Sequence, residues 1–147
     1  MSMFAGATIL LLKACSPPAN TAKEVCEDFL EKWEAKPAEL EFTHCKRVEN
    51  PQFDRLESSY VVAGADAASV EQFLQREFNL APLRFVCCVW ESTTGDANRP
   101  SHASYTDEEG YYFHISMGSE ETLLRDRKDW PNISQFHVRV TKHLGSP

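Results

Sequence analysis

The chain has 147 residues, a length typical of one domain and sufficient to bury a substantial core. Its composition is 42% hydrophobic and 25% charged, as in ordinary globular proteins, and its formal net charge is −7. Nucleic-acid binding requires clustered Lys and Arg, which this acidic chain lacks, so we expect no nucleic-acid partner.

The first 20 residues have the pattern of an export signal followed by a tether. Residues 5–12 form an apolar run that is far shorter than the roughly 20 residues of a membrane-spanning helix but suits the centre of a secretory signal. The run ends in Leu-Lys-Ala-Cys, which resembles the box in which bacterial lipoproteins are lipidated on the cysteine. We therefore predict a signal and tether over residues 1–20, lipidation at Cys15, and one domain over residues 21–147. The alternative is a buried N-terminal element in which Cys15 is structural.

Apolar residues recur along the rest of the chain at helical or alternating spacing, which predicts helices and strands respectively. Asp66 is placed to cap the second helix and Asn79 to close it. The most apolar strand contains the two adjacent cysteines, and we expect it at the centre of the sheet. In chain order, the predicted elements are a helix over 22–36, strands over 40–48 and 54–63, a helix over about 66–79, a strand over 83–90, a polar connection over 92–110, a strand over 111–117, a helix over 119–130 and a strand over 135–141.

Two stretches, residues 26–49 and 70–91, are near-copies in which a helical pattern passes through a Pro-containing turn into a strand. Phe29 matches Phe73, and Cys45 matches Cys88. The order of elements is therefore a pseudo-repeat of the form (αββ)(αββ)(αβ). We expect an α+β domain with a largely antiparallel five-stranded sheet and three helices packed on one face.

Five cysteines are more than core packing needs, and disulfides persist in exported proteins. Because Cys45 and Cys88 occupy equivalent positions, we predict a disulfide from Cys45 to Cys88 or to its neighbour Cys87, with Cys88 favoured. Cys26 lies on the apolar stripe of the first predicted helix, where a packing role is expected. A catalytic cysteine is the alternative, but His44 cannot serve Cys45, because neighbours in a strand point to opposite faces.

His114 and His137 each follow a phenylalanine within a predicted strand, so we expect both on the open face of the sheet. Two imidazoles on adjacent strands could bind a metal or act as a base, although such residues are more often polar members of a wet sheet face. The sequence contains no Ser-His-Asp signature, glycine-rich phosphate loop or His-Glu-x-x-His motif. We therefore predict no cofactor, no metal and no enzyme activity, with His114 and His137 as the candidates should a metal bind.

Aromatic and acidic residues gather in or beside the long polar connection. Tyr and Trp suit protein contacts, because they offer a large area and a polar tip. Core packing is the alternative for Trp90 and Tyr111. The residues that we expect to contact a protein partner are Trp90, Tyr105, Asp107, Glu108, Glu109, Tyr111 and Tyr112.

Four segments, residues 40–49, 84–91, 112–117 and 130–138, together resemble a family of small bacterial lipoproteins of unknown function. The double cysteine before Val-Trp-Glu is the most particular feature of the resemblance, which covers about residues 26–143. It implies a location in the cell envelope and brings no substrate, cofactor or catalytic residue.

These observations predict a non-enzymatic, exported, lipid-anchored module that faces the periplasm and binds another protein. The partner could be a basic toxin, with this chain as an immunity-type antagonist, or the chain could be an envelope assembly factor. The alternative is a small hydrolase or metal-dependent enzyme that uses His114 and His137 with a cysteine.

Overall fold

The computed structural model describes residues 24–50, 52–92 and 103–145. The predicted signal and tether with Cys15, and residues 93–102 of the predicted polar connection, lie outside the described residues. No helix within the described ranges is long and apolar enough to cross a bilayer. These ranges form, in chain order, β1 (Glu41–Val48), β2 (Arg55–Ala63), α1 (Ala67–Phe78), β3 (Leu83–Val86), β4 (Val89–Ser92), β5 (Ala103–Thr106), β6 (Tyr112–Ser119), the 3-10 helix η2 (Arg127–Asn132) and β7 (Gln135–His143).

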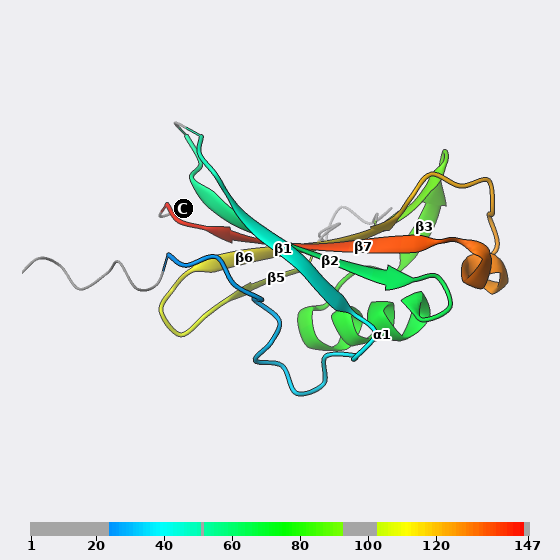
Figure 1. The fold of residues 1–147 in the computed structure, drawn as a ribbon, viewed down its shortest axis with the longest axis horizontal. Coiled ribbons are helices and arrows are strands. Elements are labelled where there is room, and N and C mark those ends of the chain that lie inside the picture. The colour runs from blue at the N-terminus through cyan, green and yellow to red at the C-terminus, as the bar shows by residue number, and fades with distance from the viewer. Residues whose placement is uncertain (1–23, 51, 93–102, 146–147) are drawn as a thin grey trace, which may run out of the picture.

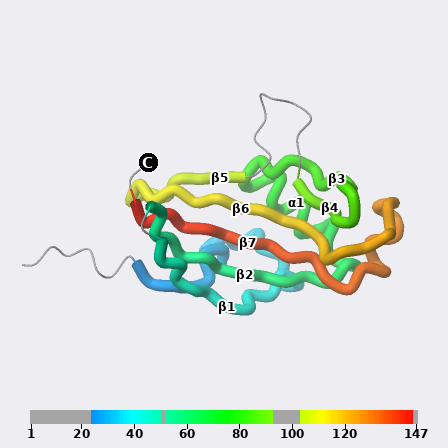
Figure 2. The backbone as a smooth tube through the Cα atoms, turned by 90° about the horizontal axis from the view of Figure 1, so that it is seen from above, coloured from blue at the N-terminus to red at the C-terminus, as the bar shows by residue number. Residues whose placement is uncertain are grey.

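The seven strands of the described residues belong to one sheet, in which every pairing is antiparallel. The order is β1-β2-β7-β6-β4-β3, and β5 pairs with β6 beside this path. Figure 2 shows β1, β2, β7, β6 and β5 side by side. The long strands β2, β7 and β6 therefore form the centre of the sheet, and short hairpin strands extend it.

The core lies on one face of the sheet, beneath which α1 and residues 24–40 are packed (Figure 1). Successive side chains of a strand point to opposite faces, so every second residue of the central strands enters the core. The helix α1 adds its own buried face. The buried residues of these elements are Leu56, Tyr60 and Val62 from β2, Phe113, Ile115 and Met117 from β6, Phe136, Val138 and Val140 from β7, and Val70, Phe73, Leu74 and Phe78 from α1.

The expected five-stranded sheet with three helices is wrong. Of the three predicted helices, the described residues form only the second as an α-helix, and the sheet has seven strands. This helix ends as predicted at Asn79, whose φ of 58° is the left-handed conformation of a helix terminus. Asp66 occupies the capping position, but its side chain makes no capping hydrogen bond.

The first predicted helix is absent, because tertiary contacts hold residues 24–40 in a series of tight turns. Backbone bonds from Glu31 to Asp28 and from Trp33 to Leu30 span three residues, so no continuous helical ladder forms. The sheet binds this segment through a disulfide at Cys26 and a hydrogen bond to the carbonyl of Glu27. Contacts of this kind override the helical spacing of its apolar residues.

The third predicted helix is reduced to the 3-10 helix η2. The backbone N–H of Glu120 donates to the carbonyl of Gln135, and that of Thr122 to the carbonyl of Cys88. Because these donors are satisfied by neighbouring strands, residues 120–126 run alongside the sheet. The helix begins only at Arg127.

The predicted strand over 83–90 is two strands, β3 and β4, joined by a turn at Cys87 and Cys88. β3 lies at an end of the strand order rather than at its centre, and the predicted polar connection contains β5. Phe29 and Phe73 do share one core, but the two near-copies fold differently. The predicted pseudo-repeat is therefore wrong.

Candidate functional site

The face of the sheet opposite α1 carries a polar hollow of about 890 Å³. Figure 2 looks onto this face, and Figure 1 shows α1 on the other side. We call this surface the open face. The residues of the strands that line it are Thr43, His44 and Lys46 from β1, Ser59, Tyr60 and Val61 from β2, His137, Val138 and Arg139 from β7, His114, Ser116, Met117, Gly118 and Ser119 from β6, and Glu91 and Ser92 from β4.

The register of the sheet explains why these residues make a hollow. His44 lies opposite Ser59, and Arg139 lies between Ser59 and Ser116, so these four residues form a row across four strands. In the next row His137 lies opposite Gly118. Small side chains thus form the floor, and longer imidazole and guanidinium groups stand around it.

The open face is cationic although the whole chain has a net charge of −7. Glu57 lies beside the hollow, where Arg55 donates to it at 2.8 Å and the ammonium of Lys46 lies 3.6 Å away. Burial raises the pKa of Glu57, but Arg55, Arg139 and Lys46 together outweigh burial and hold it below its ordinary value. Three cations, from Lys46, Arg55 and Arg139, therefore face the carboxylates of Glu57 and Glu91.

His114 and His137 both line the open face, as the alternation of their strands predicted. The structure does not bring them together. His137 lies opposite Gly118, four residues along β6 from His114, which separates the two by about 13 Å. No group of three His, Cys, Asp or Glu side chains within the described ranges could hold a metal ion. Within the described ranges, these two histidines therefore do not meet in one catalytic or metal centre.

The predicted partner-binding residues divide between the core and the surface. Trp90 is only 5% exposed, donates its indole N–H to the carbonyl of Leu124 and packs edge-on against Trp130, so it is a core residue and no partner contact. Tyr105 stacks on Phe113 with ring centroids 4.4 Å apart. Tyr111 lies under the ammonium of Lys142, Tyr112 lies near the ring of His143, and Glu108 is exposed.

Tyr105, Asp107 and Glu109 line a second cavity of about 390 Å³. We call it the acidic recess. Its other residues are Glu27, Asp28, Phe29, Glu31, Lys32, Phe113 and Lys142. Sequence reasoning missed Glu27 and Glu31, which the predicted first helix placed on a solvated face, and no pattern in the sequence links residues 27–31 to residues 107–109.

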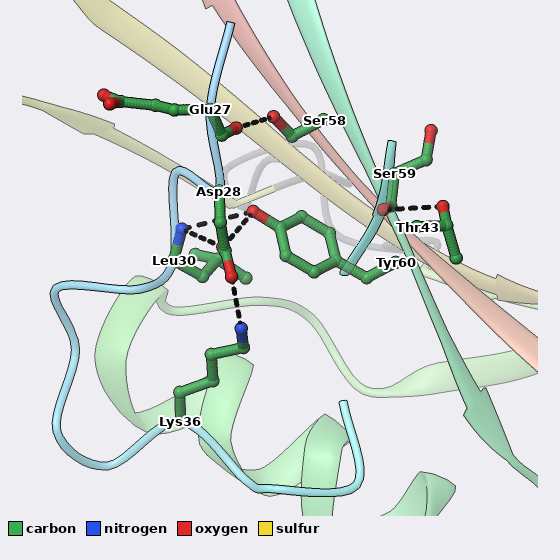
Figure 3. A network of polar contacts seen from close by, with 8 residues as sticks. All are labelled: Glu27, Asp28, Leu30, Lys36, Thr43, Ser58, Ser59 and Tyr60. Atoms are coloured by element: carbon green, nitrogen blue, oxygen red, sulfur yellow. Dashed lines mark hydrogen bonds and ion pairs between the residues drawn. The ribbon is translucent and has the colours of Figure 1, made fainter. Parts of the chain in front are cut away.

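A partly buried network of polar contacts fixes the segment that supplies half of this recess (Figure 3). The hydroxyl of Tyr60 donates to Asp28 Oδ1 at 2.7 Å, and the backbone N–H of Leu30 donates to the same oxygen at 2.9 Å. Lys36 Nζ lies 2.6 Å from Asp28 Oδ2, and Ser58 donates to the carbonyl of Glu27 at 2.6 Å. This network replaces the helical hydrogen bonds that the segment lacks.

The network shifts the pKa of two of its groups, Asp28 and Tyr60. Burial raises the pKa of Asp28, but the hydrogen bonds from Lys36, Tyr60 and Leu30 lower it by more, so the net shift is downward. Burial and then the hydrogen bond to Asp28 raise the pKa of Tyr60. Asp28 is therefore an anion that the fold stabilises, with no donor role.

The same segment is held by a disulfide between Cys26 and Cys45, whose Cα atoms lie 5.4 Å apart. The predicted pairing of Cys45 with Cys88 or Cys87 is wrong, and so is the packing role expected for Cys26. Cys87 and Cys88 are free thiols. The predicted pairing assumed that the two near-copies fold in the same way, but only the second copy has a hairpin at its cysteines.

The described residues thus form one antiparallel sheet of seven strands, with a hydrophobic core on one face and a polar hollow on the other. Residues 16–90, just over half of the 147 residues, match the family model of a domain of unknown function, DUF4952. The chain belongs to this family. Searches of curated proteins and of solved structures found no match.

Proposed function

We propose that the chain is an exported, lipid-anchored module of the cell envelope that binds another protein and holds an acidic, extended segment of it on the open face. The apolar run over residues 5–12 and the Leu-Lys-Ala-Cys box that ends in Cys15 support the export and the anchor. The observation that carries the binding is the hollow of about 890 Å³, in which Lys46, Arg139 and three histidines gather on an acidic chain. Either an immunity-type antagonist or an envelope assembly factor would work in this way.

The chemistry of the open face favours carboxylates. The exposed guanidinium of Arg139 can donate two parallel hydrogen bonds to one carboxylate, and Lys46 supplies a second cation two strands away. The hydroxyls of Ser59 and Ser116 lie on either side of Arg139 and can bind the polar backbone of an extended chain. Opposite charge on the partner would also raise the association rate, more strongly at low salt.

The acidic recess favours a second candidate, in which a basic segment binds there instead. Carboxylates from residues 27–31 and 107–109 surround the aromatic rings of Phe29, Tyr105 and Phe113. Carboxylates and aromatic faces both attract a lysine or arginine side chain. A basic toxin would bind by this route.

One experiment separates the two surfaces. Short synthetic peptides, one of Asp, Glu and Ser and one of Lys, Arg and Ser, are titrated into the ¹⁵N-labelled full chain and followed by NMR. We expect the acidic peptide to shift amides near Ser59, Ser116 and Gly118. Lys46→Ala combined with Arg139→Ala should weaken its binding about tenfold, as the loss of two exposed charge contacts implies.

The matched control is Arg76→Ala with Lys128→Ala, which removes the same charge from α1 and η2, away from the open face. An equal loss of affinity in the control, or the absence of saturable shifts on the open face, would overturn the proposal. Shifts confined to Glu31 and Glu109 with the basic peptide would favour the second candidate. The anchor is tested separately, by fatty-acid labelling of the chain and of Cys15→Ala in a bacterial host.

A further inference from the structure

The turn between β3 and β4 consists of two adjacent cysteines. Val86 pairs with Val89, so Cys87 and Cys88 alone make the connection. Cys87 has a φ of 57°, a left-handed conformation that two-residue hairpin turns require and that Gly or Asn normally supplies. For another L-residue this conformation costs about 1–2 kcal/mol. A cysteine pair at this position is therefore poorly explained by turn propensity and calls for a role of the sulfur atoms.

The geometry of the turn brings the two thiols together. Their Sγ atoms lie 2.7 Å apart, and a disulfide bond is only about 2.05 Å long. Cys87 is exposed and Cys88 is partly exposed, so reagents can reach both. Cys26 and Cys45 are already bonded to each other. Among the cysteines of the described residues, Cys87 and Cys88 can thus pair only with one another.

We propose that Cys87 and Cys88 are a redox-active pair that closes to a vicinal disulfide by exchange with an external disulfide, either a small disulfide or that of an oxidoreductase. The thiolate of Cys87 attacks one sulfur of the external disulfide, which forms a mixed disulfide and releases one thiol. The thiolate of Cys88 then attacks the Cys87 sulfur and releases the second thiol. Two electrons and two protons pass from the pair to the external disulfide, which leaves as two thiols.

The surroundings set the order of these steps. The hydrogen bond with Cys87, partial desolvation and the nearby charges of Cys87 and Glu121 raise the pKa of the Cys88 thiol. Cys87 is the more exposed of the two thiols and is therefore the first nucleophile, because an external disulfide reaches its sulfur more easily. The carbonyl of Cys88 is held by the N–H of Thr122 at 2.7 Å, which keeps the second thiol in place for ring closure.

The pair should be reduced more readily than the bond between Cys26 and Cys45. Exposed disulfides have more oxidising potentials than structural ones, and a bridge between neighbours restricts almost none of the unfolded chain. The bond between Cys26 and Cys45 is half-buried and closes a loop of 19 residues. The two disulfides of the oxidised chain are therefore expected to open in separate steps.

The test uses the full chain with Cys15→Ser, equilibrated in glutathione buffers of graded ratio, then alkylated under denaturing conditions and analysed by mass spectrometry. We expect the proteolytic peptide that contains both Cys87 and Cys88 to escape alkylation on oxidation and to weigh about 2 Da less than its unalkylated dithiol form, as closure of one intramolecular disulfide requires. The midpoint potential of the pair Cys87 and Cys88 should be less reducing than that of the pair Cys26 and Cys45. Persistent alkylation of both thiols in oxidised glutathione, or glutathione adducts that never close, would overturn the proposal.

Two single variants test the order of attack. Cys88→Ser should trap a mixed disulfide on the exposed Cys87, and Cys87→Ser should form its adduct on the less exposed Cys88 more slowly. Circular dichroism confirms that each variant folds. Equal rates for the two variants would refute the assignment of Cys87 as the first nucleophile, and ring closure in the parent chain would then be judged from the mass alone.

Discussion

The buried carboxylate of Glu71 offers the sharpest test of how this fold is held together. Its side chain is 4% exposed and accepts two hydrogen bonds from Arg127, at 2.6 and 2.9 Å. The same carboxylate accepts the backbone N–H of Leu83 at 2.6 Å, and Arg127 donates to the Leu83 carbonyl at 2.7 Å. One ion pair thus joins α1, β3 and η2.

Replacing Arg127 by Met should destabilise the protein strongly, because it leaves a buried anion with one donor. Breaking a buried pair in this way costs about 3–5 kcal/mol. Arg127 itself is 45% exposed, so water can partly replace it, and we expect a value near the lower end. About 3 kcal/mol corresponds to a decrease of roughly 10 °C in the melting temperature for a domain of this size.

The charge of Glu71 can be separated from its hydrogen bonds by adding Glu71→Gln to Arg127→Met. The glutamine oxygen still accepts from Leu83, and the unpaired charge is gone. We expect the double variant to be more stable than Arg127→Met alone by about 1–2 kcal/mol, measured by urea denaturation at neutral pH. Lys128→Met is the control, since that side chain is 78% exposed and should cost less than about 0.5 kcal/mol. A double variant no more stable than the single one would refute the buried-charge reasoning.

Four further predictions concern the covered side of the sheet. Tyr60→Phe should cost about 2 kcal/mol in urea denaturation, because it removes a partly buried hydrogen bond to a charged group. The fold lowers the pKa of Asp28, so the stabilisation by its carboxylate is complete at neutral pH and is lost as the pH falls through that lowered pKa. The difference in unfolding free energy between wild type and Asp28→Asn should therefore close below about pH 4. A difference that stays constant with pH would contradict this prediction. Cys26→Ser with Cys45→Ser should cost about 3 kcal/mol, as a loop of 19 residues implies, and should remove most of the difference in unfolding free energy between oxidised and reduced protein. Gly64→Ala should cost at least about 2 kcal/mol in thermal unfolding, since its Cβ would lie 2.0 Å from the Trp130 carbonyl oxygen.

The sequence predicted those elements whose signals are local. The strands expected over 40–48, 54–63, 111–117 and 135–141 are confirmed as β1, β2, β6 and β7, because alternation of apolar residues reports which face is buried. The helix expected to end at Asn79 is confirmed as α1 for a similar reason. These elements could be predicted without information about the segments that pack against them.

The failures occur where a distant partner decides the local structure. Residues 24–40 have helical spacing, but Ser58, Tyr60 and Cys45 hold that segment from the sheet. The apolar run from Leu83 to Trp90 forms a hairpin that the sequence did not indicate, because its turn is made by cysteines rather than by Gly or Asn. Such partners cannot be read from spacing along one segment.

The candidate site was predictable in part for the same reason. Alternation placed His114 and His137 on the open face, and it did so correctly. Their separation depends on the register between β6 and β7, which a single sequence does not reveal. The acidic recess depends on the path of residues 24–40 and was hidden by the wrong helix. The sequence thus predicted the face of the sheet on which each histidine lies, but it did not predict which residues come together at one site.

The serines on the floor of the open face make the sheet less stable than it could be, which we attribute to the proposed binding of a partner. Ser59 and Ser116 lie in central strands, where β-branched residues would be more stable, by up to about 1 kcal/mol. Local rules are broken in this way mainly at functional sites. Ser59→Thr with Ser116→Thr should therefore raise the free energy of unfolding by several tenths of a kcal/mol, while the added methyl groups fill the hollow beside Arg139 and weaken binding of the acidic peptide. Ser104→Thr is the control, since that exposed residue pairs with His114 on β6 but does not line the cavity. A double variant that gains stability and keeps full affinity would show that the hollow does not hold the peptide.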